Sequence, residues 1–207
     1  MKIESVCVFA ASSPGIPDIY LNAGRELASI LVSQDISMTY GAGAVGIMGV
    51  MADTMLEKKG RVTGVIPSFM VKMGWAHKGV SRLVKVKSMH ERKRRMIRGV
   101  DAVVAMPGGV GTLEEVMEVI TLKQLGQFLK PIVILNTNGF YDPLLEQLEK
   151  MVSERFMRPL HNDIWQVCNE TSRVLDTIVR APDWDGSHIK YAAVDHRDDD
   201  TIRTYGQ

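Results

Sequence analysis

Residues 102–115 have the sequence AVVAMPGGVGTLEE. The first part is apolar and predicts a buried strand, whereas residues 113–129 carry apolar side chains three and four positions apart, which predicts an amphipathic helix. The glycines between them let the backbone approach an anion closely, and the free amides at the helix start would donate hydrogen bonds to it. The segment therefore predicts a strand-to-helix turn that binds phosphate. Because it lacks the lysine of a Walker A motif, it does not predict nucleoside triphosphate hydrolysis.

Strands and helices alternate in the same way along the rest of the chain. Apolar runs predict strands over residues 3–10, 36–40, 62–66, 83–86, 102–106 and 132–135. Helical periodicity is present over residues 17–33, 47–58, 89–98, 113–129 and 142–156, with a further strand and a closing helix predicted over 165–167 and 170–180. Such alternation is typical of α/β proteins with a Rossmann-like, doubly wound parallel sheet. We expect a single domain over residues 1–182 and a polar, flexible tail over residues 183–207.

The charge balance argues against nucleic-acid and membrane partners. The 207 residues include 25 Lys plus Arg and 24 Asp plus Glu, which gives a formal net charge of +1. The longest apolar stretch, residues 42–52, is too short for a membrane helix, and the N-terminus has no signal-peptide pattern, so we expect a cytoplasmic protein. Cys7 and Cys168 lie in apolar segments, as reduced core thiols do, and the histidines are scattered. The sequence therefore predicts neither a metal site nor a cofactor.

A second glycine-rich turn follows the second predicted strand. Gly41, Gly43 and Gly46 have the spacing G-x-G-x-x-G, which alone indicates dinucleotide binding only weakly. No acidic residue ends the next strand, where a ribose-binding carboxylate is expected, so a phosphate or a close backbone contact is favoured over NAD. Residues 10–15 form a third turn of small side chains. We expect the three turns to converge on one pocket, and we include Met48 among its residues.

Two charged features each have a functional and a structural interpretation. Glu115 fits a capping box with Thr112, and it equally fits an anion of the binding site. Basic residues are dense between positions 92 and 98, where they predict either cations facing the glycine turn or a solvated helix surface. On a helix, Met89, Arg92 and Met96 would share one side, while Arg94 and Arg98 would lie on another. These basic side chains therefore cannot all contact one ligand.

The motif Pro107-Gly-Gly-x-Gly-Thr-x-x-Glu115, preceded by Met89-His-x-Arg-Lys93 and Arg98-x-x-Asp101, resembles the signature of the Lonely Guy family of cytokinin-activating phosphoribohydrolases. Similar segments cover most of residues 3–145. The resemblance implies a Rossmann-like homodimer or larger oligomer. It also implies hydrolysis of the N-glycosidic bond of adenosine 5′-monophosphate, N6-modified or not, to the free base and ribose 5-phosphate.

On the matching positions, the resemblance implies that Arg98 and Glu115 are catalytic. We hypothesise that Glu115 stabilises positive charge developing on the ribose, that Arg98 holds Glu115 ionised, and that the glycine turn binds the phosphate. The implied nucleotide-binding residues are Arg92, Lys93, Gly108, Gly109, Val110, Gly111, Thr112, Leu113, Glu114 and Thr121, together with Gly41, Gly43, Gly46 and Met48.

The chain departs from the pattern of this family at Ala42, where glycine is usual, at Ala10 and Ala11, where Cys-Gly is common, and at Val110, where tyrosine is frequent. We expect Ala42 and Val110 to alter the preference for base or ribose rather than the reaction. Two other functions stay open. One is a nucleotide-binding sensor without turnover. The other is a lysine decarboxylase, a label given to some chains of the family, for which the sequence offers no independent evidence of a pyridoxal-phosphate lysine.

Overall fold

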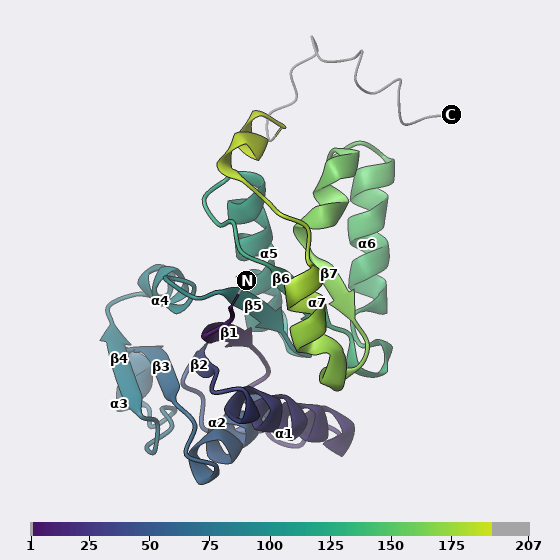
Figure 1. Cartoon of the computed structure of the whole chain (residues 1–207). Helices are drawn as coiled ribbons and strands as arrows, with labels where there is room; N and C mark the ends of the chain where they lie inside the picture. Colours follow the sequence, from purple (N-terminus) through teal and green to yellow (C-terminus); the bar gives the residue numbers. More distant parts are fainter. Residues whose placement is uncertain (1, 192–207) are drawn as a thin grey trace.

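The predicted apolar runs form one parallel sheet in the computed structural model, which describes residues 2–191 (Figure 1). The strands are β1 (Ser5–Phe9), β2 (Ser37–Tyr40), β3 (Val62–Pro67), β4 (Arg82–Val86), β5 (Ala102–Ala105), β6 (Ile132–Leu135) and β7 (Gln166–Cys168). They lie in the order β4-β3-β2-β1-β5-β6-β7, and neighbouring strands are parallel throughout. The predicted α/β class and parallel sheet are therefore confirmed.

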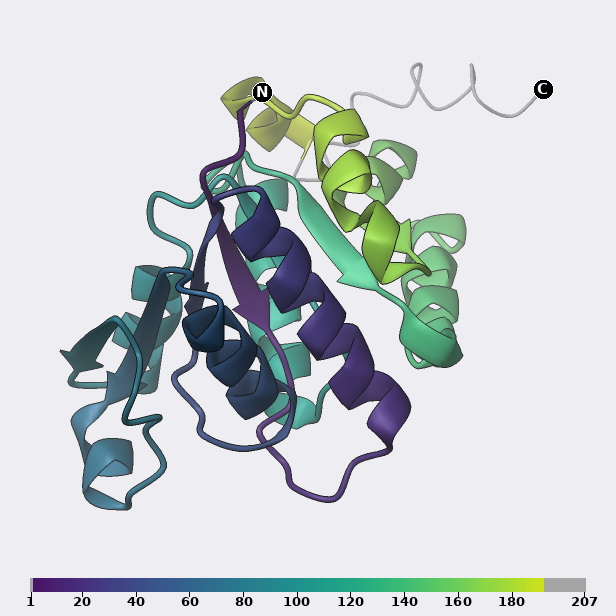
Figure 2. The ribbon, with the colours of Figure 1, turned by 60° about the horizontal axis from the view of Figure 1, so that its bottom comes forward.

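Helices cover both faces of the sheet. They are α1 (Asp18–Ser33), α2 (Gly46–Glu57), α3 (Ser68–Lys72), α4 (Met89–Met96), α5 (Val110–Gln124), α6 (Asp142–Ser153) and α7 (Val174–Arg180). Side chains of α1, α2 and α7 join one core cluster, on the face turned forward in Figure 2, and those of α4, α5 and α6 join a second. Alternate residues of β1 contribute to each: Val8 to the first and Cys7 to the second. The sheet is thus doubly wound, as predicted.

The direction of strand order reverses at β1, because β2 lies on one side of it and β5 on the other. In open parallel sheets, ligands bind beyond the carboxyl ends of the strands at such a point, where neighbouring turns diverge. The turns after β1, β2 and β5 are the segments rich in glycine and other small residues. The fold therefore brings together the turns that the sequence analysis singles out.

Helix boundaries differ from the prediction in ways that affect the site. α4 ends at Met96 rather than at residue 98, and the chain then turns through Gly99, whose φ is +76°. α5 begins at Val110 rather than at residue 113, because Gly109 takes the N-cap position. The sequence does not predict α3, whose five residues are too few to show a helical period and include none that is buried.

The packed domain extends past the predicted boundary at residue 182. Trp184 is buried, and its Nε1 donates a hydrogen bond to the carbonyl of Lys123 (2.9 Å). Because the residues around Trp184 are mostly polar, the composition of this segment does not predict that Trp184 is buried. The remainder of the predicted tail, residues 192–207, lies outside the described residues. Within residues 2–191, no helix has both the length and the apolar character that crossing a membrane requires.

Candidate active site

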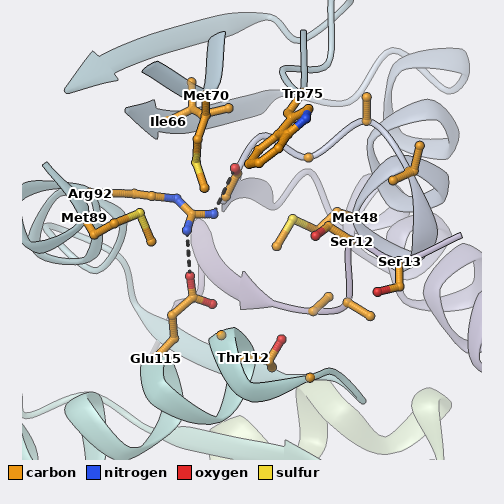
Figure 3. A pocket seen from close by; sticks show the side chains of 18 of the residues that line it. Ser12, Ser13, Met48, Ile66, Met70, Trp75, Met89, Arg92, Thr112 and Glu115 are labelled. Carbon is orange, nitrogen blue, oxygen red and sulfur yellow. Dashed lines mark hydrogen bonds and ion pairs between the residues drawn. The ribbon is translucent and has the colours of Figure 1, made fainter. Parts of the chain in front are cut away.

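The turns after β1, β2 and β5 meet around a cavity of about 580 Å³ (Figure 3). The first turn contributes residues 10–13, the second contributes Gly41, residues 43–45 and Met48, and the third contributes Gly109, Gly111 and Thr112. The remaining walls consist of Ile66, Met70, Gly74, Trp75, Met89, Arg92 and Glu115. The prediction that the three turns converge on one pocket is confirmed.

The amino end of α5 is open to this cavity. Gly109 is the N-cap residue, the cap has no side-chain hydrogen bond, and the first turn carries no acidic residue. Helical bonding begins where the amide of Leu113 donates to the carbonyl of Gly109 (3.1 Å), so the preceding amides are the orphan donors of the helix start. Together with the positive end of the helix dipole, they make an anion-binding position.

Gly108 supports this turn from behind rather than lining the cavity. A Cβ at position 108 would lie 2.1 Å from the Thr112 Oγ1 atom, whereas a Cβ at Gly109 or Gly111 would meet no atom within 4 Å. Thr112, which is buried, therefore packs against the turn only because residue 108 is glycine. The glycines of the motif thus have different roles: one allows packing, and the others expose backbone to the cavity.

Glu115 is a buried carboxylate in the cavity wall. The capping-box interpretation is wrong, because Thr112 lies inside α5 and the N-cap residue is Gly109. The Glu115 side chain is 4% exposed, and its Oε1 lies 3.3 Å from Nη1 of Arg92. Its Oε2 is buried and has no hydrogen-bond partner within residues 2–191. Glu115 therefore holds one oxygen on a cation while the other has bonding capacity for a ligand or water.

The environment of Glu115 raises the pKa of its carboxyl group. Burial is the largest cause and outweighs the attraction of Arg92, which lowers the pKa, so the resulting value is about 7. Both protonation states are then populated near neutral pH. A carboxyl group with such a pKa, in a cavity, is suited to proton transfer or to stabilising a developing positive charge.

Arg92 is held from three directions. Its Nε donates to the carbonyl of Val65 (3.1 Å) and its Nη2 to the carbonyl of Gly41 (3.0 Å), while Nη1 faces Glu115. A Cβ at Gly41 would lie 1.9 Å from Nη2, so the guanidinium occupies space that only a glycine leaves free. The first glycine of the G-x-G-x-x-G turn therefore serves Arg92, which accounts for the spacing without a dinucleotide.

The predicted contact between Arg98 and Glu115 is absent from the described structure, and Arg92 occupies that position instead. Arg92 and Met96 are the buried residues of α4, one turn apart. Arg98 follows the end of this helix, is exposed, and does not line the cavity. The physical reason is that α4 presents the side of Arg92 and Met96 to the sheet and ends before Arg98.

Other residues in the predicted nucleotide site lie away from the cavity. Lys93 forms ion pairs with Glu114 and with Glu118 (2.8 Å for the latter), along the side of α5. Thr121 is exposed and its hydroxyl donates to the carbonyl of Met117 (2.8 Å). Leu113 packs against the second core cluster. These side chains surround the site without entering it in this chain.

Of the three departures from the family pattern, Ala42 and Val110 lie outside the cavity lining, whereas Ala10 and Ala11 belong to it. Ala42 has φ +59°, and its Cβ faces β3, where a Cβ at Gly64 would approach it to 2.7 Å. Val110 is 83% exposed. Gly46, at φ +65°, lets the first and second turns pack together, since a Cβ there would lie 2.6 Å from the carbonyl oxygen of Ser13. Ala42 and Val110 therefore do not line the cavity of the described structure, and their effect on substrate preference stays a prediction.

Several lining residues are absent from the sequence-based prediction. Ser12 and Ser13 belong to the small-residue turn after β1, so their position was available from the sequence pattern. Met70 and Trp75 come from α3 and the connection to β4, which carries no motif. An isolated bridge between Gly43 and Ala76 holds that connection at the cavity. Such a long-range contact cannot be predicted from local sequence patterns.

Comparison of the sequence with known proteins identifies its family. A family model described as "Possible lysine decarboxylase" matches residues 48–178. A "Probable cytokinin riboside 5'-monophosphate phosphoribohydrolase" of Oryza sativa subsp. japonica is 42% identical over 79% of this chain and 72% of its own length. A cytokinin riboside 5'-monophosphate phosphoribohydrolase of Arabidopsis thaliana is 40% identical over 75% of this chain and 73% of its own length.

Solved structures with low sequence identity share the fold. A molybdenum cofactor carrier protein from Chlamydomonas reinhardtii has a TM-score of 0.66 at 16% identity, covering 86% of this chain and 98% of its own. A molybdenum cofactor binding protein from Rippkaea orientalis has a TM-score of 0.65 at 19% identity, with 86% and 97% covered. At such identities the likeness concerns the fold alone. The identity to the plant enzymes is much higher, and the chain belongs to the family of cytokinin riboside 5′-monophosphate phosphoribohydrolases.

Proposed function

We propose that this chain hydrolyses the N-glycosidic bond of an adenosine 5′-monophosphate, N6-modified or not, and releases the free base and ribose 5-phosphate. The observation that carries the proposal is the buried pair of Glu115 and Arg92 in the same cavity as the open amino end of α5. One cavity thus combines an anion-binding position with a carboxylate suited to a cationic transition state. The names of the plant relatives support the same reaction.

The 5′-phosphate would bind the amides at the start of α5, beside the Thr112 side chain. Glu115 lies less than two helical turns after this position and faces the same cavity, so a phosphate bound there would leave the ribose facing the carboxylate. Binding energy from the phosphate, which does not react, would then serve to position the bond that breaks. The phosphate interaction is expected to make the nucleotide a far better substrate than the nucleoside.

Glu115 would act on the ribose. As the bond from C1′ to the base nitrogen breaks, positive charge develops on the sugar, and an ionised Glu115 stabilises it. Water adds to C1′ through its oxygen, and the proton that it loses ends on the departing base. Oε2 of Glu115 has the unused hydrogen-bonding capacity to orient that water, while Arg92 fixes Oε1. In this proposal Arg92 takes the position first assigned to Arg98.

Incubation with AMP and separation of the products tests the reaction. Adenine and ribose 5-phosphate in equal amounts are the expected result. Tight AMP binding without products would instead establish the alternative, a nucleotide sensor. The same assay with N6-isopentenyl-AMP, GMP and CMP measures the rate at which each free base is released. Comparison of these rates with the rate for AMP identifies the preferred base.

The rate should depend on pH through Glu115. Its pKa of about 7 means that the ionised form, which the mechanism requires, is lost as the pH falls below neutrality. We expect kcat/KM to decrease by about tenfold per pH unit below the pKa and to level off above it. Initial rates with AMP between pH 5 and 9 at constant ionic strength measure this. A rate that is flat across that interval, or that rises toward acid, would contradict the role of an ionised Glu115.

The substitution Gly41→Ala should impair the reaction by displacing Arg92. The new methyl group would overlap with Nη2 of Arg92, so the guanidinium must move from Glu115. A displacement of this kind costs on the order of 100-fold in kcat/KM. Gly186→Ala is the matched control, because a Cβ at Gly186 meets no atom within 4 Å. Equal activity of both variants with AMP would show that the position of Arg92 does not matter.

A lysine decarboxylase, the activity in the description of the family model, is disfavoured by the residues of the cavity. Pyridoxal phosphate would need a lysine for its Schiff base, and none of the cavity-lining residues in the described part of the chain is a lysine. Lys123 is buried and its pKa is lowered to about 8 by burial, but its Nζ lies 5.7 Å from the centroid of the Trp184 ring and it does not line the cavity. The residues therefore do not fit this cofactor.

We also propose that the enzyme is a cytoplasmic homodimer. Phe69 and Met73, on and just after α3, are 52% and 62% exposed, and exposed apolar side chains grouped in this way mark protein interfaces. Cys7 and Cys168 are both buried and free, in keeping with a reducing compartment. Light scattering during size-exclusion chromatography would give the mass directly, and a monomer at assay concentration would refute the dimer.

A further inference from the structure

Trp75 is an exposed tryptophan on the wall of the cavity. Its residue is 52% exposed, whereas Trp165 and Trp184 are each 7% exposed and belong to the second core cluster. Figure 3 shows the indole on the opposite side of the cavity from Thr112 and Glu115. A large aromatic surface left open inside a pocket is a typical ligand contact.

The backbone around Trp75 is fixed. The Trp75 amide donates to the carbonyl of Met70 (3.2 Å), and the next residue, Ala76, bridges to Gly43. The His77 amide donates to the carbonyl of Ala42 (2.9 Å), and the His77 ring lies 2.9 Å from a carboxylate oxygen of Asp53. The indole is therefore carried by a segment bonded to the second glycine turn, which also holds Arg92 in place.

The wall beside Trp75 is apolar. Figure 3 shows Ile66 and Met70 on the same side of the cavity as the indole, Thr112 and Glu115 on the opposite side, and the Arg92 guanidinium between Met70 and Glu115. A base placed here meets aromatic and thioether surface instead of hydrogen-bonding side chains. Recognition by such a wall depends on the area of the flat ring, not on its pattern of donors and acceptors.

We infer that Trp75 is the stacking platform for the nucleobase and sets a preference for purine over pyrimidine nucleotides. The inference rests on the proposed function for the location of the phosphate and ribose. With the phosphate at the start of α5 and the ribose at Glu115, the base extends toward the opposite wall, where the indole lies. A purine offers a larger surface for stacking than a pyrimidine does.

Substitution of Trp75 tests this assignment. Trp75→Leu should raise the KM for AMP about tenfold and leave kcat near that of the unmodified enzyme, because stacking energy is present in both the bound substrate and the transition state. The KM for CMP should rise less, so that the ratio of kcat/KM for AMP to that for CMP falls. Trp75→Phe should restore most of the preference, since a phenyl ring also stacks.

Phe156→Leu is the matched control, because Phe156 is an exposed aromatic residue that does not line the cavity. It should retain the AMP-to-CMP ratio of the unmodified enzyme. If the AMP-to-CMP ratio of kcat/KM is unchanged in Trp75→Leu, because activity is either retained or lost equally for both nucleotides, the assignment of Trp75 is overturned and the proposed hydrolase function is not affected. Thermal melting of each variant shows that the fold persists.

Intrinsic fluorescence separates this inference from the reaction itself. AMP should quench the tryptophan emission, ribose 5-phosphate should not, and Trp75→Phe should lose the AMP-dependent quenching. If no nucleotide is hydrolysed but this pattern is observed, the proposed function fails and the stacking role stands. If AMP binds without any quenching that depends on Trp75, the stacking role is refuted whether or not hydrolysis occurs.

Discussion

Glu115→Gln should lose at least about 100-fold in kcat for AMP hydrolysis, because it removes the carboxylate that is proposed to stabilise positive charge on the ribose. The fold should survive. Glutamine has nearly the same shape as glutamate, its carbonyl oxygen can still accept a hydrogen bond from Arg92, and a neutral side chain costs less to bury than an anion. A product-resolved assay measures the loss, and a thermal melt tests the fold.

The neighbouring Glu118→Gln provides the control for this experiment. Glu118 lies on the same helix and pairs with Lys93 (2.8 Å), but it does not line the cavity. Its substitution should leave kcat near that of the unmodified enzyme. The residual activity of Glu115→Gln should also lose its dependence on a group with a pKa near 7. Hydrolysis by Glu115→Gln at nearly the normal rate would remove this carboxylate from the mechanism.

The fold could be predicted from the sequence because its strands are recognisable as apolar runs. Central strands such as β5 and residues 6–9 of β1 are buried on both faces, so these residues are all apolar, and segments with helical periodicity separate the strands. α3 escaped prediction because its residues make no buried face. Trp75 reaches the cavity through long-range backbone contacts to the second glycine turn, which are set by tertiary packing.

The location of the candidate site was predicted correctly, but the arginine that contacts Glu115 was not. The glycine turns fixed where the site lies, since parallel topology brings their ends together. Helical periodicity placed Arg92 and Met96 on one side of α4 and Arg98 on another, and the structure buries the former pair. The resemblance to the family, however, assigned the catalytic role to Arg98 from its position in the motif. Which side of a helix faces the site depends on its packing against the sheet, and a motif alone does not record that.

Glu115 illustrates a second limit of local patterns. The spacing from Thr112 satisfies a capping box, but a capping box exists only if Thr112 is the N-cap residue. Gly109 takes that place, so α5 starts earlier and Glu115 lies well inside the helix, facing Arg92. Glycine at an N-cap leaves the helix amides without a side-chain partner, and the same feature that defeats the pattern opens the amino end of α5 to an anion.

The two arginines can be separated by experiment, and we expect the larger effect at Arg92. Arg92→Lys keeps a positive charge but cannot donate to the carbonyls of Val65 and Gly41 and also hold Glu115, because an ammonium lacks the planar set of donors of a guanidinium. We expect kcat/KM for AMP to fall by about 100-fold, in the range found when a preorganised electrostatic partner is lost. Arg98→Lys should retain activity to within about twofold, as is usual for an exposed side chain.

The pH dependence gives a readout that a purely structural role of Arg92 would not produce. Arg92 lowers the pKa of Glu115, whereas burial raises it, so a weaker or displaced cation lets the pKa rise further above 7. The pH at which kcat/KM reaches half its maximum should therefore move to higher values in Arg92→Lys and stay unchanged in Arg98→Lys. The same shift in both variants, or a greater loss of activity in Arg98→Lys, would return the catalytic role to Arg98. A loss in Arg92→Lys with no shift would mean that Arg92 acts on the substrate and not through Glu115.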